Sequence, residues 1–269
     1  MLRCFFLTLA LAVPLSVSAQ EQFITLASTT SAQQSGLLGH IIPLFRQQTG
    51  IDVRVLAVGS GRALQLGRQG EADALLVHDR AGEIKFMTEG HGLDRREVVD
   101  NSFVLVGPKT DPAGIRGHGA VEAAMRLAAK KAPFVSRGDD SGTEHMELRL
   151  WRLAEAKRPS GEGYFQTGQG MSETLTHAAH RNAYTLTDRA TWLAFKDRKD
   201  LVILIGRDAA LLNTYSSLLV SPAKGVHIKA ADARTWHDWL TSEEGYKAIA
   251  SFRIDGEQVF FSTSTKPRG

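Results

Sequence analysis

Short apolar segments alternate with amphipathic ones along the first ninety residues, and this order restricts the possible folds more than any other feature. Residues 23–27 and 51–57 have the length and apolar content of strands. Between them, residues 35–48 place apolar side chains at helical spacing, and Gly50 is a typical helix end. A strand at 74–77 and a helix at 80–90 continue the series. This order predicts a parallel sheet with helices on its faces.

A second unit with the same alternation follows. Its predicted helices span 120–131, 142–157 and 171–180, and its predicted strands span 133–136 and 201–205. The apolar segments 103–108 and 217–222 bracket this unit, and both end at a proline. We interpret them as two crossings between two lobes, the first made of 20–106 and 216–269 and the second of 107–215. Chance explains the similarity of these two short strand ends equally well.

The N-terminus predicts secretion. Arg3 precedes an apolar run over residues 4–15, and small residues follow at 17–19, the pattern of a signal peptide covering residues 1–19. A buried N-terminal helix is the alternative. Cleavage would remove Cys4, the only cysteine, so the mature chain would have no disulfide or thiolate metal site. The formal charge of +3 is mixed along the chain, which argues against a nucleic-acid partner.

Four loops rich in hydroxyl groups and glycines follow predicted strands or precede predicted helices. They span 28–31, 59–61, 136–143 and 168–172. The first N–H groups of a helix lack partners within the helix, and the helix dipole makes that end positive. Glycines let the backbone approach an anion, and Arg137 adds a charged donor. Turn formation and helix capping explain any single loop better, but four together favour an anion site. Ser141 and Glu144 also have the spacing of a capping box.

Several motifs resemble those of the tungstate-binding proteins of ABC importers. The segments Ala27–Ser31 and Ser35–Leu38, followed by Ala72–Asp79, Ser136–Thr143, Gly170–Met171 and Ala183–Arg189, are similar to theirs and occur in the same order. The resemblance covers nearly the whole mature chain. It implies an α/β, two-lobed type-2 periplasmic binding protein, with mixed or parallel sheets, flanking helices and a two-strand hinge.

The resemblance also implies a set of oxyanion-binding residues. The first lobe would supply the hydroxyls of Thr29, Thr30 and Ser60 and the backbone N–H of His78, whose side chain is not expected at the ligand. The second lobe would supply Arg137, Ser141, Thr143, Gly170 and Tyr184. Two positions depart from the family pattern. Ser28 replaces a threonine, and Glu144 stands where a histidine is frequent.

The resemblance implies a periplasmic solute-binding protein that captures tungstate between its lobes and delivers it to an ABC permease in the inner membrane. We expect a monomer with no cofactor, no metal site and no enzymatic activity. A site made only of donors suits tungstate or molybdate, which are fully ionised, better than hydrogen phosphate, whose proton needs an acceptor. Receptors for molybdate, sulfate or phosphate remain alternatives. So do a serine hydrolase using Ser60 or Ser141 with a histidine, and a ligand sensor.

Overall fold

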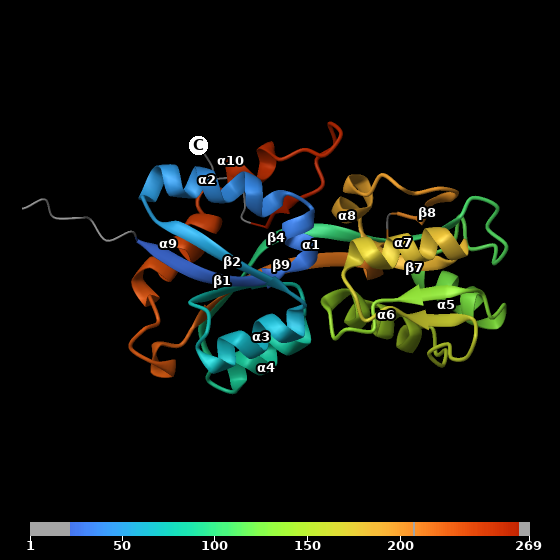
Figure 1. Cartoon of the computed structure of the whole chain (residues 1–269), viewed down its shortest axis with the longest axis horizontal. Coiled ribbons are helices and arrows are strands. Elements are labelled where there is room, and N and C mark those ends of the chain that lie inside the picture. The colour runs from blue at the N-terminus through green and yellow to red at the C-terminus, as the bar shows by residue number, and fades with distance from the viewer. Residues whose placement is uncertain (1–21, 207, 264–269) are drawn as a thin grey trace, which may run out of the picture.

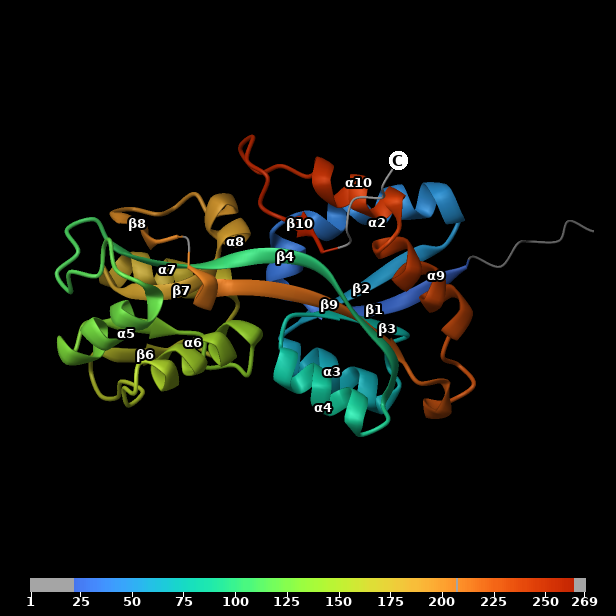
Figure 2. The ribbon, with the colours of Figure 1, turned by 180° about the vertical axis from the view of Figure 1, so that it is seen from behind.

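A computed structural model describes residues 22–206 and 208–263, and the predicted signal peptide lies outside these residues. The described chain forms two lobes joined by two long strands (Figure 1). The joining strands are β4 (Gly92–Pro108) and β9 (Leu212–Val220), which pair in antiparallel orientation. Figure 2 shows both strands from behind, passing from one lobe toward the other. No helix in this part of the chain has the length and apolar content needed to cross a membrane.

The first lobe is built on a sheet in the order β2-β1-β3-β9-β4. Strand β1 is parallel to β2 and β3, as the strand–helix alternation predicts, and β9 is antiparallel to β3. The remaining elements of this lobe are β1 (Phe23–Thr29), β2 (Asp52–Val58), β3 (Ala74–Val77), β10 (Phe261–Ser262), α1 (Thr30–Gln34), α2 (Leu37–Thr49), α3 (Ser60–Gln69), α4 (Arg80–Thr88), α9 (Ala230–Leu240) and α10 (Glu243–Ser251).

The second lobe is built on the order β4-β7-β5-β6, with β8 also paired to β4. Strands β5, β6 and β7 are mutually parallel, whereas β4 is antiparallel to β7 and β8. The elements are β5 (Phe134–Ser136), β6 (Tyr164–Gln166), β7 (Tyr184–Asp188), β8 (Leu201–Ile205), α5 (Ala120–Ala129), α6 (Gly142–Leu153), α7 (Met171–Arg181) and α8 (Arg189–Ala194).

Strand β4 belongs to both sheets. Its residues as far as Ser102 pair with β9, and those from Phe103 onward pair with β7 and β8. The predicted division into 20–106 plus 216–269 and 107–215 remains a prediction, because a shared strand gives no single boundary. Apolar clusters cover both faces of each sheet, as sheets with parallel strands require.

The predicted helix 35–48 corresponds to α2, and a short additional helix, α1, precedes it. Gly36 separates α1 from α2 with a left-handed backbone, φ 87°. A glycine adopts this conformation without the steric cost that other residues have. The periodic apolar residues begin at Leu37, the first residue of α2, so the sequence pattern locates α2 but not α1.

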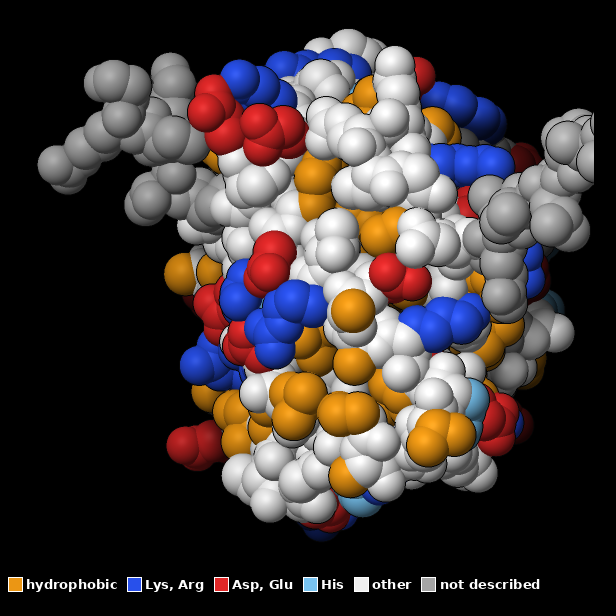
Figure 3. All heavy atoms as spheres, turned by 90° about the vertical axis from the view of Figure 1, so that its left-hand side faces the viewer, with side chains coloured by type: hydrophobic (Ala, Val, Ile, Leu, Met, Phe, Trp, Pro, Cys, Tyr) orange, Lys and Arg blue, Asp and Glu red, His pale blue; other side chains and the backbone are white. Residues whose placement is uncertain are grey.

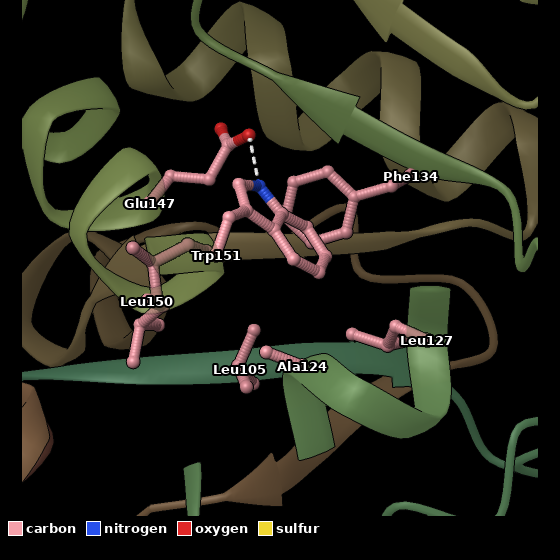
Figure 4. A pocket seen from close by; sticks show the side chains of 8 residues that line it. Leu105, Ala124, Leu127, Phe134, Glu147, Leu150 and Trp151 are labelled. Carbon is pink, nitrogen blue, oxygen red and sulfur yellow. Dashed lines mark hydrogen bonds between the residues drawn. The ribbon is translucent and has the colours of Figure 1, made fainter. Parts of the chain in front are cut away.

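A small cavity of about 10 Å³ lies in the core of the second lobe (Figure 4). Within it, the Trp151 indole N–H donates to a carboxylate oxygen of Glu147 at 2.9 Å, and burial raises the pKa of this carboxyl. Its other lining residues are apolar. A cavity of this size holds about one water molecule at most, so it is a packing gap and not a ligand site.

Candidate anion-binding site

The carboxyl ends of β1, β2 and β3 meet at one edge of the first sheet. Thr29 is in register with Val58, and Ser28 with Leu76. The loops that follow these strands therefore start close together. They begin at Thr30, at Gly59 and at His78, the segments in which the sequence predicts anion-binding groups. Parallel α/β sheets bind ligands at this edge.

The hydroxyl run after β1 divides into two orientations. Ser28 is buried and donates to a backbone carbonyl of β3 at 2.8 Å, so it points into the sheet. The Thr29 hydroxyl lies 3.0 Å from that of Ser31, which in turn lies 3.3 Å from the hydroxyl of Tyr215. Thr30 is half-buried at the first position of α1. The structure therefore groups Thr29 and Ser31 with Tyr215, a residue that sequence reasoning missed.

Ser60 begins α3 directly after β2. Its side chain is fully buried, and among the described residues its hydroxyl has no hydrogen-bond partner. Leaving a buried hydroxyl unpaired costs about 1–3 kcal/mol. Such a group is therefore a candidate for contact with a bound ligand.

His78 follows β3, and its side chain lies at the junction of the lobes. Its Nδ1 donates to the side-chain oxygen of Asn213 at 2.8 Å, and its ring stacks on Tyr215 with centroids 4.6 Å apart. A Cβ atom added to Gly142, at the start of α6, would lie 2.7 Å from the imidazole Cε1. The ring therefore borders the second-lobe helix α6, and the expectation that this side chain does not contact the ligand stays a prediction.

Burial sets the charge of His78. Desolvation, together with the nearby positive charge of Arg137, lowers the pKa of its imidazole to about 4. The ring is therefore neutral near pH 7 and adds no charge to the site. The side-chain oxygen of Asn213 accepts the hydrogen bond from His78. The amide nitrogen of the same side chain is buried and has no partner among the described residues.

Arg137 follows β5 and is buried. Its Nε donates to the backbone oxygen of Gln169 at 2.7 Å, and its Nη2 donates to Asp139. Asp139 thus orients Arg137. The other carboxylate oxygen of Asp139 is buried without a partner within the described residues. This places one acceptor beside the predicted donors.

The start of α6 is capped differently from the predicted capping box. Ser141 is the N-cap and accepts the Glu144 backbone N–H at 3.3 Å, as expected. The Glu144 carboxylate, however, accepts the backbone N–H of Asp140 at 2.8 Å and pairs with Arg158 at 3.1 Å. The positive φ of Asp140, 57°, gives this loop a turn that the capping-box pattern does not include. The Glu144 carboxylate is therefore held by Asp140 and Arg158. Thr143, in the first turn of the helix, is buried.

The structure does not bring Tyr184 to this group. Its hydroxyl accepts the backbone N–H of Ala113 at 2.8 Å and donates to Asp111 at 3.0 Å, within the apolar core of the second lobe. Gly170 is the N-cap of α7, and a Cβ added there would be 2.5 Å from the Glu173 carboxylate. The tyrosine that lies beside Ser31 is Tyr215, on a joining strand.

Helix ends and loops of the two lobes touch directly. The backbone N–H of Gly61 donates to the carbonyl of Asp140 at 3.3 Å. The Ser172 hydroxyl donates to the side-chain oxygen of Gln34 at 3.1 Å. The segments that hold the predicted site residues of the first lobe therefore lie against those of the second.

The hydrolase alternative requires a histidine at Ser60 or Ser141. Within the described residues Ser60 has no hydrogen-bond partner, and the Ser141 hydroxyl caps α6. A serine–histidine pair does exist between Ser217 and His237, 2.8 Å apart, but both side chains are fully buried. A substrate could not reach them. No group of three His, Cys, Asp or Glu residues in the described part of the chain is placed to hold a metal.

Comparisons with known proteins agree with this geometry. Residues 16–244 match the PBP superfamily domain. The chain is 41% identical to a tungstate-binding protein of Peptoclostridium acidaminophilum, over 85% of this chain and 81% of that protein. It is 42% identical to a putative ABC transporter anion-binding protein of Haloferax volcanii, over 91% of this chain and 73% of that protein.

Solved structures give the same result. The tungstate-binding protein of Desulfovibrio alaskensis superposes with a TM-score of 0.79 at 39% identity, covering 91% of this chain and all of that chain. A tungstate ABC transporter structure from Geobacter sulfurreducens has a TM-score of 0.79 at 45% identity, covering 86% and 99%. The chain belongs to the family of tungstate-binding proteins of ABC transporters, within the PBP superfamily.

Proposed function

We propose that this protein captures tungstate between its two lobes in the periplasm and delivers it to the permease of an ABC importer. It acts by binding and not by catalysis. Ligand contacts from both lobes would stabilise the closed arrangement over the open one. The family membership and the facing loops of the two lobes support this proposal.

One observation carries the proposal. The Ser60 hydroxyl and the Asn213 amide nitrogen are buried and lack partners among the described residues, and a buried arginine lies on the facing lobe. Each unpaired donor costs about 1–3 kcal/mol. A small oxyanion offers several acceptor oxygens to such donors and a negative charge to Arg137, so its binding would recover this cost.

A second ligand has an observation in its favour. The unpaired carboxylate oxygen of Asp139 is an acceptor beside Arg137. It could accept the proton of hydrogen phosphate, whereas it would repel a fully ionised tungstate if it faced the ligand. The bond to Arg137 neutralises part of this charge. The relatives favour tungstate, and phosphate is the competitor to test.

Calorimetric titration of the mature chain with tungstate, molybdate, sulfate and phosphate tests the proposal. We expect tungstate and molybdate to bind more tightly than the other two. Arg137→Ala should weaken tungstate binding by about 2 kcal/mol, or roughly 30-fold, because a charge-assisted bond is lost. Arg152→Ala is the matched control, since Arg152 is exposed on α6 of the same lobe. Tight phosphate binding without tungstate binding would reject the proposal.

A further inference from the structure

An ion pair joins the lobes beside the candidate site. Nδ1 of His145, on α6, lies 2.9 Å from a carboxylate oxygen of Asp79, which follows β3 in the first lobe. Nε2 of the same ring lies 2.8 Å from Asp140, which belongs to the second lobe. His145 therefore connects a partner from its own lobe with one from the opposite lobe.

We propose that His145 is a positioning residue that holds the lobes closed through Asp79, and so makes anion capture tighter at neutral than at alkaline pH. This inference rests on the proposed capture of an oxyanion between the lobes. His145 itself does not contact the ligand. It acts through its two partners, Asp79 and Asp140, which are next to His78 and Ser141 in the chain.

The position of the pair explains how it would act on the site. Asp79 directly follows His78, whose ring borders Gly142, and Asp140 directly precedes Ser141, the N-cap of α6. Only the bond to Asp79 must break when the lobes separate, because Asp140 moves with His145. The pair therefore adds stability to the closed arrangement alone, which is the requirement for a closure device.

The charges around His145 favour its protonated form. Asp79 and His78 face it from the segment between β3 and α4, and Asp140 faces it from its own lobe. The hydrogen bond to Asp79 raises the pKa of His145 to about 9. Burial opposes the charge of Asp79, but the bond to His145 holds the pKa of that carboxyl below its usual value. His78 is neutral and does not compete.

The sign of the pH effect follows. The pKa of His145 is higher in the closed arrangement than after loss of Asp79, so closure takes up a proton. The stabilisation is fully present below the ordinary histidine pKa of about 6.5 and is lost as pH rises through about 9. Anion affinity should therefore fall over this interval. Since the imidazole is partly exposed, solvent screening limits the effect to about fivefold.

The test titrates tungstate into the wild type, His145→Gln, Asp79→Asn and the double variant at pH 7 and pH 10. Each single change should weaken binding at pH 7 by about fivefold, and the double change should weaken it no further. The wild type should lose affinity by a similar factor at pH 10, and the variants should not. His118→Gln is the matched control, because His118 pairs with Glu122 at 3.0 Å within the second lobe.

Two results would overturn the inference: variants that bind like the wild type at pH 7, or variants that keep the wild-type pH dependence. If the wild type binds no tungstate, the proposed function fails and closure is measured directly. Fluorescent labels on cysteines introduced at the exposed Lys85 and Lys130 report the distance between lobes. A shorter distance at pH 7 than at pH 10 in the wild type, absent in His145→Gln, supports the role. Equal distances refute it.

Discussion

Replacing Gly142 with alanine tests whether His78 and the start of α6 meet when the lobes close. An alanine Cβ at this position would lie 2.7 Å from Cε1 and 2.9 Å from Nδ1 of the His78 ring. Real carbon contacts are not this short, so one side must shift. The ring cannot move freely, because Asn213 holds its Nδ1 and Tyr215 stacks on its face.

The expected effect concerns closure and not folding. Inserting a methyl group into a filled contact costs about 1–3 kcal/mol, which corresponds to roughly a 5- to 150-fold rise in the dissociation constant for tungstate. Gly142 does not have a positive φ, and it is the first residue of a helix. Alanine is the better helix former by about 0.5–1 kcal/mol, so the ligand-free open protein should keep its thermal stability.

Calorimetry with tungstate and a thermal melt without ligand measure both quantities. Gly39→Ala is the control, since Gly39 lies within α2 and an added Cβ there meets no described atom within 4 Å. Weaker binding by Gly142→Ala at unchanged ligand-free stability would confirm the reasoning. An unchanged dissociation constant in both variants would show that His78 and α6 do not meet in the bound state.

Two further substitutions separate site residues from core residues. Ser60→Ala should weaken tungstate binding by about 1.5 kcal/mol, or roughly tenfold, as measured by calorimetry. It should not lower the thermal stability of the ligand-free protein, because the Ser60 hydroxyl has no partner among the described residues. A loss of stability at unchanged affinity would contradict this. Tyr184→Phe should cost about 1–3 kcal/mol of unfolding free energy in urea, because the buried Ala113 N–H loses its acceptor. Its affinity should not change, and a loss of affinity would return Tyr184 to the site.

The mixed charge of the surface and the burial of apolar side chains in the cores follow from composition and patterning more than from any single residue. Acidic and basic side chains are interspersed on the end of the first lobe (Figure 3), as the mixed charge of the sequence predicts. Trp192 and Trp236 are buried in the cores. Both features depend on averages over many positions, which a single sequence displays.

The sequence by itself determined the parts of the protein that depend on neighbouring residues. The alternation of strands and helices, the end of α2 at Gly50 and the Ser141 cap of α6 all lie where local patterns predict them. These features form through contacts between residues a few positions apart. The hydroxyl-rich loops are local for the same reason, so the motifs that indicate the family were readable without a structure.

Only the tertiary structure decided which groups face one another across the lobes. It placed Tyr215 beside Ser31 and Tyr184 in the core of the second lobe, and it set the His78 ring against α6. It also paired Asp79 with His145, residues far apart in the chain. These contacts depend on how β4 and β9 cross between the sheets, and no pattern within one segment records the angle at which two lobes meet.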